Sequence, residues 1–525
     1  MNYNILKNIK TVLASTLLCS LFLVSCTNNF EDMNRNPAEP TDDEILEGYY
    51  KLGAFFPQML NYAYPAQENA YQMGENLIGD PYGRYLSIAN TWSSNFSTFN
   101  APSGWINSPF NDAFEKVYGG WTQVKEQTGD EGQLFAWAQI IRVTAMQRIT
   151  DMYGPIPYSQ VGSGSLGSAY DSQEDVYKNM FTDLDAAIAE LTTFVAENPS
   201  YNAMAKFDKV YSGDFTKWIK YANSLKLRMA LRIVYADPAL AKQKAEEAVS
   251  HPIGVIVSNN DNTQNAFPQN PIWTMTTAWG DSRVCADIIA YMAGYDDPRM
   301  AQYFTKSQVE GGPEYLGLRT GITISGKDWA DRYSSTTYSQ TAPTLWMAAS
   351  EIAFLKAEGA LRGWSMGGTA KDLYEEGVRL SFSQWLASGA DTYLEDATSK
   401  PGDYADPDSK LAAKAVSTIT IKWNDADPFE TKLERLITQK WIAMYPLGQE
   451  AWSEQRRTGY PHFFPVLVNA SDDPNLTTRL ASRIPFAPDE KNNNAQNYEN
   501  AVKLLGGADN YSTKLWWDKN PNKGW

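Results

Sequence analysis

Three stretches of the chain place tryptophan side chains close to amide, carboxylate and guanidinium groups. The residues are Trp92, Asn95 and Trp105 in the first stretch, Trp273, Trp279, Asp281 and Arg283 in the second, and Trp329, Asp331 and Tyr333 in the third. A flat aromatic ring covers an apolar face of C–H groups, while amides, carboxylates and guanidinium groups form hydrogen bonds with hydroxyls. Because a sugar ring offers both kinds of surface, these ten residues predict a carbohydrate-binding site.

Burial in a core is the alternative for each of the five tryptophans, because large aromatic side chains are common core material. We expect at least two of the five to be exposed. Another four tryptophans fall within amphipathic helical patterns, and we expect them in the core. These are Trp218, Trp346, Trp385 and Trp441.

Catalytic chemistry has few candidate residues in this chain. The two histidines, His251 and His462, cannot form a histidine cluster for zinc, and they leave little room for a histidine-centred triad. Glycoside hydrolysis needs two carboxyl groups about 5–10 Å apart beside the aromatic residues. Asp281, Asp328 and Asp331 are the acids placed to provide them. These residues therefore predict neither a cofactor nor a metal site, and glycoside hydrolysis is kept as the weaker alternative to binding.

The charge of the chain restricts its ligands. The 525 residues include 45 Lys and Arg against 61 Asp and Glu, which gives a net charge of −16. This surplus of acids repels nucleic acid and anionic lipid. A neutral glycan suits such a surface, and a basic peptide would suit it too.

Residues 1–25 have the pattern of a signal peptide rather than of a folded element. Two lysines precede an apolar stretch that is too short for a comfortable membrane span. The sequence Leu-Val-Ser-Cys that follows is similar to a bacterial lipobox, which implies cleavage before Cys26 and lipid attachment to that residue. An ordinary secretory signal that ends near a cysteine is the alternative. Residues 26–40 are polar, and we expect a tether there and a single domain over residues 41–525.

Apolar residues at helical spacing predict four helix pairs in that domain. The clearest pair covers residues 213–250, where Asp214 is placed to cap the first helix and Asp237-Pro238 separates it from the second. Two helices with so short a connection pack against each other, but one pair cannot bury its apolar stripe alone. The other pairs are predicted over residues 133–196, 344–386 and 429–457.

Long segments rich in aromatic, Asn and Gly residues separate the pairs, over residues 67–120, 252–281 and 310–342. Helical periodicity is poor there after Tyr85, so we expect long loops with short helices. Loops of this length in a compact protein are usually functional, and their aromatic content argues against disorder. The sequence thus predicts a mainly α protein with a tetratricopeptide-like arrangement of helix pairs. Cys285 falls in a further helical pattern, and we expect it to be buried.

Short motifs that occur in order along the whole chain resemble one protein family. After the lipobox they are Asp151-Met-Tyr-Gly-Pro-Ile-Pro-Tyr158, Gly213-Asp-Phe-Thr-Lys-Trp218, Asp297-Pro-Arg-Met300, Tyr315-Leu-Gly-Leu-Arg-Thr-Gly321, Gln439-Lys-Trp-Ile-Ala-Met-Tyr445, Glu450-Ala-Trp-Ser-Glu-Gln-Arg-Arg457 and Leu515-Trp-Trp-Asp518. Together they resemble the SusD/RagB family of outer-membrane lipoproteins, and most of all its second large branch.

The resemblance implies a fold, a location and a function. Four tetratricopeptide-like helix pairs would form a scaffold, with the loop-rich, irregular segments packed on it as a second half. The protein would sit on the cell surface, anchored in the outer membrane through lipid on Cys26, and cap a SusC-like TonB-dependent transporter. It would capture a glycan on the loops named above and pass it into the transporter. It would not be an enzyme, so no catalytic residues are expected. RagB-like members bind peptides, so a peptide ligand is the alternative, and it would need sheet edges or amide-rich grooves.

Overall fold

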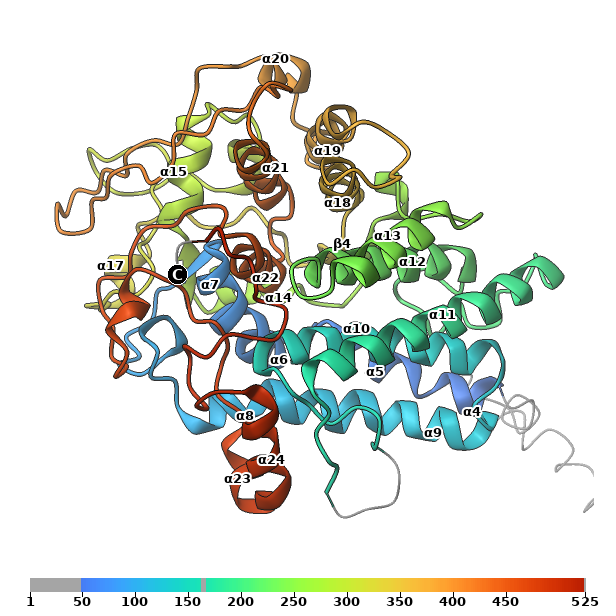
Figure 1. Cartoon of the computed structure of the whole chain (residues 1–525). Coiled ribbons are helices and arrows are strands. Elements are labelled where there is room, and N and C mark those ends of the chain that lie inside the picture. Colours follow the sequence, from blue (N-terminus) through green and yellow to red (C-terminus); the bar gives the residue numbers. More distant parts are fainter. Residues whose placement is uncertain (1–48, 162–166, 524–525) are drawn as a thin grey trace, which may run out of the picture. The chain divides into compact units, whose positions relative to one another are not determined.

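The computed structural model of the chain describes residues 49–161 and 167–523 (Figure 1). The chain divides into two units, residues 1–51 and 52–525, and helix α4 (Tyr49–Gly53) crosses their boundary. All other described elements belong to the second unit. The predicted signal peptide, the tether and the lipid-attachment residue Cys26 lie outside the described residues.

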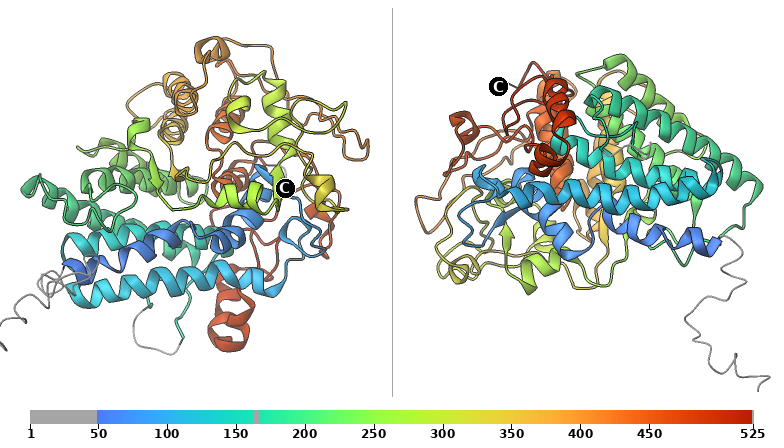
Figure 2. Two further views of the ribbon diagram at one scale, coloured as in Figure 1. Left: turned by 180° about the vertical axis from the view of Figure 1, so that it is seen from behind. Right: turned by 90° about the horizontal axis from the view of Figure 1, so that it is seen from below.

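The first helix pair consists of α10 (Gly132–Tyr153) and α11 (Gln173–Glu197), which lie side by side (Figures 1 and 2). Ser172 begins α11, because its hydroxyl accepts a hydrogen bond of 3.1 Å from the N–H of Asp175. Gly154 ends α10 with a φ of 96°, which residues with a side chain rarely adopt. The apolar face of α11 is buried, as the spacing of its residues predicts.

The second pair, α12 (Phe215–Arg232) and α13 (Pro238–Ser250), has the caps that the sequence predicts. The carboxylates of Asp214 and Asp237 each accept a hydrogen bond of 3.1 Å from the backbone N–H three residues further along the chain. These bonds satisfy donors that the first turn of each helix leaves free.

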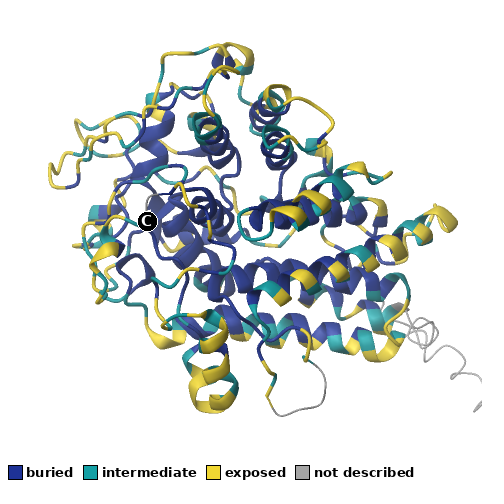
Figure 3. Cartoon of the chain, viewed as in Figure 1, coloured by how far each residue is buried: buried dark blue, intermediate teal, exposed yellow. Residues whose placement is uncertain are grey.

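Two further pairs complete the scaffold. They are α18 (Ala349–Leu361) with α19 (Ala370–Gln384), and α21 (Phe429–Ala443) with α22 (Gly448–Thr458). In Figure 3, α10 and α22 are almost entirely buried, whereas α11 exposes residues along one side. The predicted fold class, mainly α with four tetratricopeptide-like pairs as a scaffold, is confirmed.

Strands replace the beginning of two predicted helices. The third pair is predicted to start with helix, but Thr344–Met347 is strand β4, antiparallel to β2 (Thr263–Asn265). A second predicted helix begins as strand β3 (Ser282–Val284) and continues as α15 (Ala286–Gly294). A short apolar run in the sequence fits either a strand or the end of a helix. In both segments, pairing with a strand that is distant in sequence determines that a strand forms.

The segment 67–120 is mostly helical, so the prediction of long loops there is wrong outside residues 84–102. Its two π-helical turns shift the apolar pattern away from a period of 3.6 residues, which hides the helices from the sequence. Gly120 is also needed for packing, since a Cβ atom there would lie 2.6 Å from Cγ of Met59. The elements of this region are α5 (Phe56–Ala63), α6 (Glu68–Tyr71), η1 (Gln72–Gly79), α7 (Asp80–Gly83), β1 (Leu86–Ile88), η2 (Phe96–Thr98), α8 (Ser103–Asp112), η3 (Ala113–Val117) and α9 (Tyr118–Thr128).

The predicted core aromatic residues are buried with one exception. Trp218, Trp346 and Trp441 are buried, although Trp346 lies in β4 rather than in a helix. Trp385 is half-buried at the end of α19, where the centroid of its ring lies 4.4 Å from the centroid of the Tyr303 ring. Cys285 is fully buried, as expected.

The loop-rich half contains short elements that are joined by irregular backbone. α15 and α17 lie to the left in Figure 1 and to the right in the reversed view of Figure 2. Within the described residues, no helix has both the length and the apolar character needed to cross a membrane. The remaining elements are η4 (Asn259–Asp261), α14 (Pro271–Trp273), η5 (Thr274–Ala278), α16 (Met300–Tyr303), α17 (Lys327–Ala330), α20 (Ala390–Leu394), η6 (Pro474–Thr477), α23 (Pro488–Asn493) and α24 (Ala495–Leu505).

Candidate functional site

Strands β1 and β3 bring the first two of the aromatic stretches together. They pair antiparallel, with Ser87 opposite Arg283. The pairing continues beyond the strands, since the N–H of Ala89 donates to the carbonyl of Asp281 at 2.7 Å. Residues that are almost 200 positions apart in sequence therefore start from adjacent backbone.

Asp281 joins these two stretches to the third. Its carboxylate accepts hydrogen bonds from the amides of Gln72 at 3.0 Å and Asn90 at 2.8 Å. Lys327, at the start of α17, places its Nζ 2.6 Å from the same carboxylate. Asp281 is buried, so these partners compensate the loss of its hydration.

Arg283 forms a second link between the second and third stretches. Its Nη1 donates to the carbonyls of Thr276 at 3.0 Å and Ser282 at 2.7 Å, while Nη2 pairs with the carboxylate of Asp331. Burial lowers the pKa of Arg283, and Asp331 offsets part of this effect. Gly280 makes the approach possible, because it has a φ of 66° and lies directly against the Asp331 carboxylate.

Trp279 is the exposed aromatic residue of this group, with 37% of its surface accessible. Lys327 Nζ donates to its carbonyl at 2.6 Å, which fixes the backbone beneath the ring. In the described part of the chain, the indole makes no ring contact and no hydrogen bond of its own. Asn90, Trp279, Asp281, Arg283, Lys327 and Asp331 form what we call the loop cluster.

Trp329 and Tyr333 lie on the third stretch and pack against each other, with ring centroids 5.2 Å apart. Trp329 is half-buried against an apolar cluster that contains Tyr333, Tyr404 and Phe464. The hydroxyl of Tyr333 donates to Asp406 at 3.0 Å, and burial followed by this carboxylate raises the pKa of the phenol. Tyr333 is therefore a packing residue, whereas Trp329 keeps part of its ring accessible.

The first stretch contributes a pair of half-buried rings. Trp92 and Trp105 meet edge to face at 5.2 Å. Asn95 is buried and caps η2, since its carboxamide oxygen accepts from the N–H of Thr98 at 3.2 Å and its amide donates to the carbonyl of Trp92 at 3.0 Å. Asn95 thus supports the loop instead of presenting its amide to a ligand.

Trp273 is separate from the loop cluster. It is half-buried at the end of α14, whose N-terminus is capped by Asn270. Its indole makes no ring contact or hydrogen bond within the described residues. Of the five tryptophans, one is exposed and four are half-buried, so the expectation of at least two exposed rings is wrong.

Sequence analysis missed some residues that complete these contacts. Gln72 and Asp406 lie far from the aromatic stretches in sequence and reach them only through the fold. Lys327 carried a usable signal, because it immediately precedes Asp328-Trp329 and α17. The structure therefore joins the predicted residues in two groups. Arg283 pairs with Asp331, and Lys327 connects the carbonyl of Trp279 with Asp281, which also bonds to Asn90.

The chain is similar to one protein family over most of its length. The model of the SusD-like family, described as Susd and RagB outer membrane lipoprotein, matches residues 32–518. Among curated proteins, no sequence matches the chain.

Solved structures give the same result. A chitin-binding SusD homologue from Flavobacterium johnsoniae has a TM-score of 0.87 and 39% identity, covering 90% of this chain and 100% of that one. A SusD homologue from Bacteroides uniformis has a TM-score of 0.84 and 42% identity, with the same coverage of each chain. One from Bacteroides thetaiotaomicron has a TM-score of 0.85 and 41% identity, covering 90% of this chain and 99% of that one.

Proposed function

Because the chain belongs to the SusD/RagB family of outer-membrane lipoproteins, we propose that it captures a glycan at the cell surface and delivers it to a SusC-like TonB-dependent transporter. The exposed indole of Trp279 beside the half-exposed Lys327 and Asp331 is the observation that carries the proposal. An open aromatic face covers the C–H groups of a sugar, and the polar groups beside it bond the hydroxyls.

The support beneath Trp279 suits a binding site. Lys327 holds the Trp279 carbonyl, and Gly280 turns the chain directly after it. A backbone that is held in place before binding loses little conformational freedom when a ligand arrives. Trp92 and Trp329 are half-buried on the first and third stretches, and we propose them as further aromatic contacts for a ligand.

Glycoside hydrolysis fits these contacts poorly. Asp281 is paired with Lys327, and Asp331 with Arg283. Hydrolysis needs two carboxyl groups that face the scissile bond from either side, whereas both of these carboxylates already bond to cations of the protein. These pairs support a role in binding rather than catalysis, and we propose that the protein is not an enzyme.

The test is a binding measurement on the soluble chain that starts after Cys26. Calorimetry against a panel of glycans, with oligopeptides as a second arm, gives the ligand class. Chito-oligosaccharides are the first probe, because one similar structure is described as chitin-binding. We expect saturable glycan binding, and Trp279→Ala should weaken it at least about tenfold, or 1.4 kcal/mol.

A matched control removes a tryptophan from the scaffold instead. Trp364 is half-buried in the connection between α18 and α19, so Trp364→Ala should leave glycan affinity unchanged. Peptide binding without glycan binding would show that the ligand is a peptide and not a glycan. Release of reducing ends over time would overturn the assignment as a binding protein.

Anchoring by lipid on Cys26 is a separate part of the proposal. The lipobox-like sequence ends a predicted signal peptide, and several acyl chains hold a protein firmly at a membrane. Cys26→Ser should move the protein from the membrane fraction to the soluble fraction in cells. Unchanged membrane association of the variant would contradict lipid attachment at this residue.

A further inference from the structure

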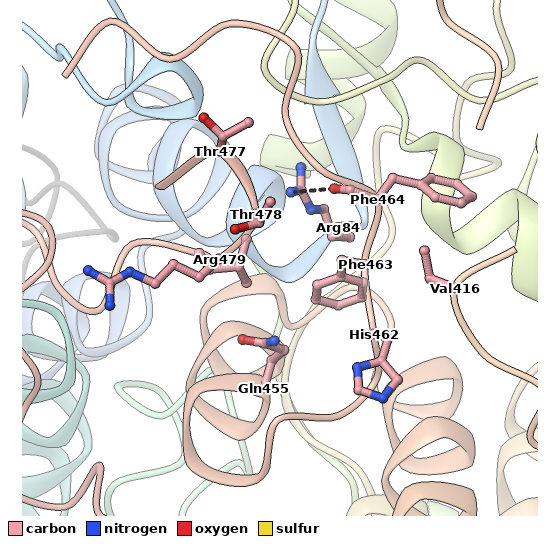
Figure 4. Close-up of a pocket in the computed structure, with 10 residues that line it drawn as sticks. Arg84, Val416, Gln455, His462, Phe463, Phe464, Thr477, Thr478 and Arg479 are labelled. Carbon is pink, nitrogen blue, oxygen red and sulfur yellow. Dashed lines mark hydrogen bonds between the residues drawn. The ribbon is translucent and has the colours of Figure 1, made fainter. Parts of the chain in front are cut away.

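A cavity of about 240 Å³ lies between the ends of α7 and α22, and we call it the arginine pocket (Figure 4). Arg84 follows α7, and Gln455 comes from the last turns of α22. The segments 462–464 and 477–480 close its other sides. The pocket shares no residue with the loop cluster or with the ten site residues predicted from the sequence.

The arginine pocket is basic although the chain as a whole is acidic. None of its lining residues is an aspartate or a glutamate. Arg84 is 2% exposed, and among the described residues no carboxylate oxygen lies within 4.0 Å of its guanidinium nitrogens. Its Nη2 donates to the carbonyl of Phe464 at 3.3 Å. The buried Asp287 bonds to the N–H of the same Phe464 at 2.7 Å but does not pair with Arg84. A buried guanidinium without a directly paired acid favours the entry of an anion.

Three buried polar atoms of the lining residues have no hydrogen-bond partner. They are the Nε donors of Arg84 and Arg479 and the Oε1 acceptor of Gln455, a residue that is 5% exposed. Unpaired groups at this depth cost free energy of folding, and a bound molecule with both an acceptor and a donor would satisfy them. An anion alone would pair with Arg84 but offer nothing to Gln455.

The backbone at Arg84 is strained as well. Its φ of 63° lies in the left-handed region, which glycine adopts freely and other residues rarely. Glycine would therefore suit the end of α7 better than arginine does. Strained residues of this kind concentrate at ligand sites, which agrees with a use for the guanidinium.

The rim of the arginine pocket adds an aromatic surface and a hydroxyl. The Phe463 ring is half-buried, and Thr478 is exposed. In Figure 4 both lie around the Arg84 side chain, whereas the guanidinium of Arg479 points away from them. Arg479 pairs with Asp473 at 3.0 Å. The volume holds one ring, since it is below the roughly 300–1,000 Å³ of sites for drug-sized ligands.

We propose that the arginine pocket binds one hexuronate ring. The carboxylate pairs with Arg84, a ring hydroxyl donates to Oε1 of Gln455, and the apolar face of the ring covers Phe463. Free sugar acids and uronic-acid residues at the end of a glycan share this chemistry. The proposal does not depend on glycan binding at Trp279, because the two sites have no residue in common.

Calorimetry with the soluble mature chain tests the proposal, with glucuronate, glucose and inorganic sulfate as probes. Glucuronate should bind at least about tenfold more tightly than either of the others, because glucose lacks the carboxylate and sulfate lacks the ring. Equal affinity for glucose, stronger binding of sulfate, or no binding of glucuronate would overturn the proposal. A glycan with a terminal glucuronate as a fourth probe distinguishes a chain end from the free acid.

Single substitutions test whether glucuronate binds in the arginine pocket. Arg84→Met should abolish glucuronate binding, and Thr478→Tyr should do the same by filling the entrance from an exposed position that does not disturb the fold. Arg379→Met is the matched control, because Arg379 pairs with Asp391 at the surface and does not line the pocket, and it should bind within about twofold of the wild type. Trp279→Ala should also bind glucuronate normally, which separates this result from the test of the loop cluster. Undiminished binding by Thr478→Tyr would show that glucuronate binds elsewhere.

Discussion

Charged side chains meet in two regions of the molecule, between the helices of the scaffold and in the loop cluster. In the scaffold, Arg457 donates to Glu358 at 2.6 Å through two nitrogens and to Glu454 at 2.9 and 2.7 Å. Lys440 pairs with Glu454 from the neighbouring helix at 2.7 Å. All four side chains are buried, so each ion is paired by other ions instead of by water.

In the loop cluster one partner of each ion pair is open to solvent. Lys327 has 38% of its side chain exposed and Asp331 has 46%, while Asp281 and Arg283 beneath them are buried. Water competes for exposed partners, so such pairs contribute only about 0–1 kcal/mol to stability. Buried pairs in the scaffold bind helices together, whereas the half-open pairs leave polar groups available to a ligand.

The largest effect should come from removing a buried cation of the scaffold. Arg457→Met leaves the carboxylates of Glu358 and Glu454 short of a partner in the core, and breaking such pairs costs about 3–5 kcal/mol. Urea unfolding measures this loss. Arg379→Met is the control, since Arg379 pairs with Asp391 at the surface and should lose at most about 1 kcal/mol. Equal losses for both variants would contradict the distinction between the regions.

The same network makes the stability of the scaffold dependent on acid. Burial alone would raise the pKa of Glu358, but Arg457 and Arg362 outweigh it and hold the pKa below its usual value, and that of Glu454 is lowered further. Because the folded-state pKa values are depressed, this stability is complete above the unfolded pKa of about 4.3 and is lost as the pH falls through the folded values.

Urea unfolding between neutral pH and pH 3 should therefore show a steep loss of stability for the wild type. Arg457→Met should lose less over the same range, because the glutamates have no cation at that position to lose. Parallel curves for the two proteins would show that other groups carry the acid sensitivity.

A smaller effect on folding and a larger one on binding should follow from Lys327→Met. The change removes the bonds to Asp281 and to the Trp279 carbonyl, while the exposed position limits the loss of stability to about 1 kcal/mol. Looser support of Trp279 should lower the affinity for the glycan roughly tenfold, or 1.4 kcal/mol. Calorimetry and urea unfolding separate the two effects, and normal affinity would show that Lys327 does not organise the site.

The scaffold could be predicted from sequence because its signals are local. Asp214 and Asp237 cap helices within three residues of their own positions, and the apolar stripe of α11 repeats within one helix. The loop cluster is different, since Asp281 acquires its partners Gln72 and Asn90 across 209 and 191 residues. Residue types alone indicated aromatic and polar groups suited to sugars, but not which of them meet.

Arg84 is an example of a residue whose surroundings in the fold cannot be predicted from local sequence patterns. Its neighbours in the arginine pocket, Gln455 and Phe463, come from the far end of the chain, and nothing around it in sequence marks a pocket. Likewise, η3 interrupts the helical period between α8 and α9, and so the sequence predicts a loop where packing against α5 produces a helix.

The smallest effect is expected at Trp273, a predicted site residue that the structure leaves apart from the loop cluster. Trp273→Phe keeps an aromatic ring in this half-buried position, so stability and glycan affinity should both stay within about twofold of the wild type, or 0.4 kcal/mol. Calorimetry on Trp273→Phe and Trp279→Ala under the same conditions compares their glycan affinities directly. A tenfold loss at Trp273 would extend the ligand surface beyond the loop cluster onto α14, within the same loop-rich half.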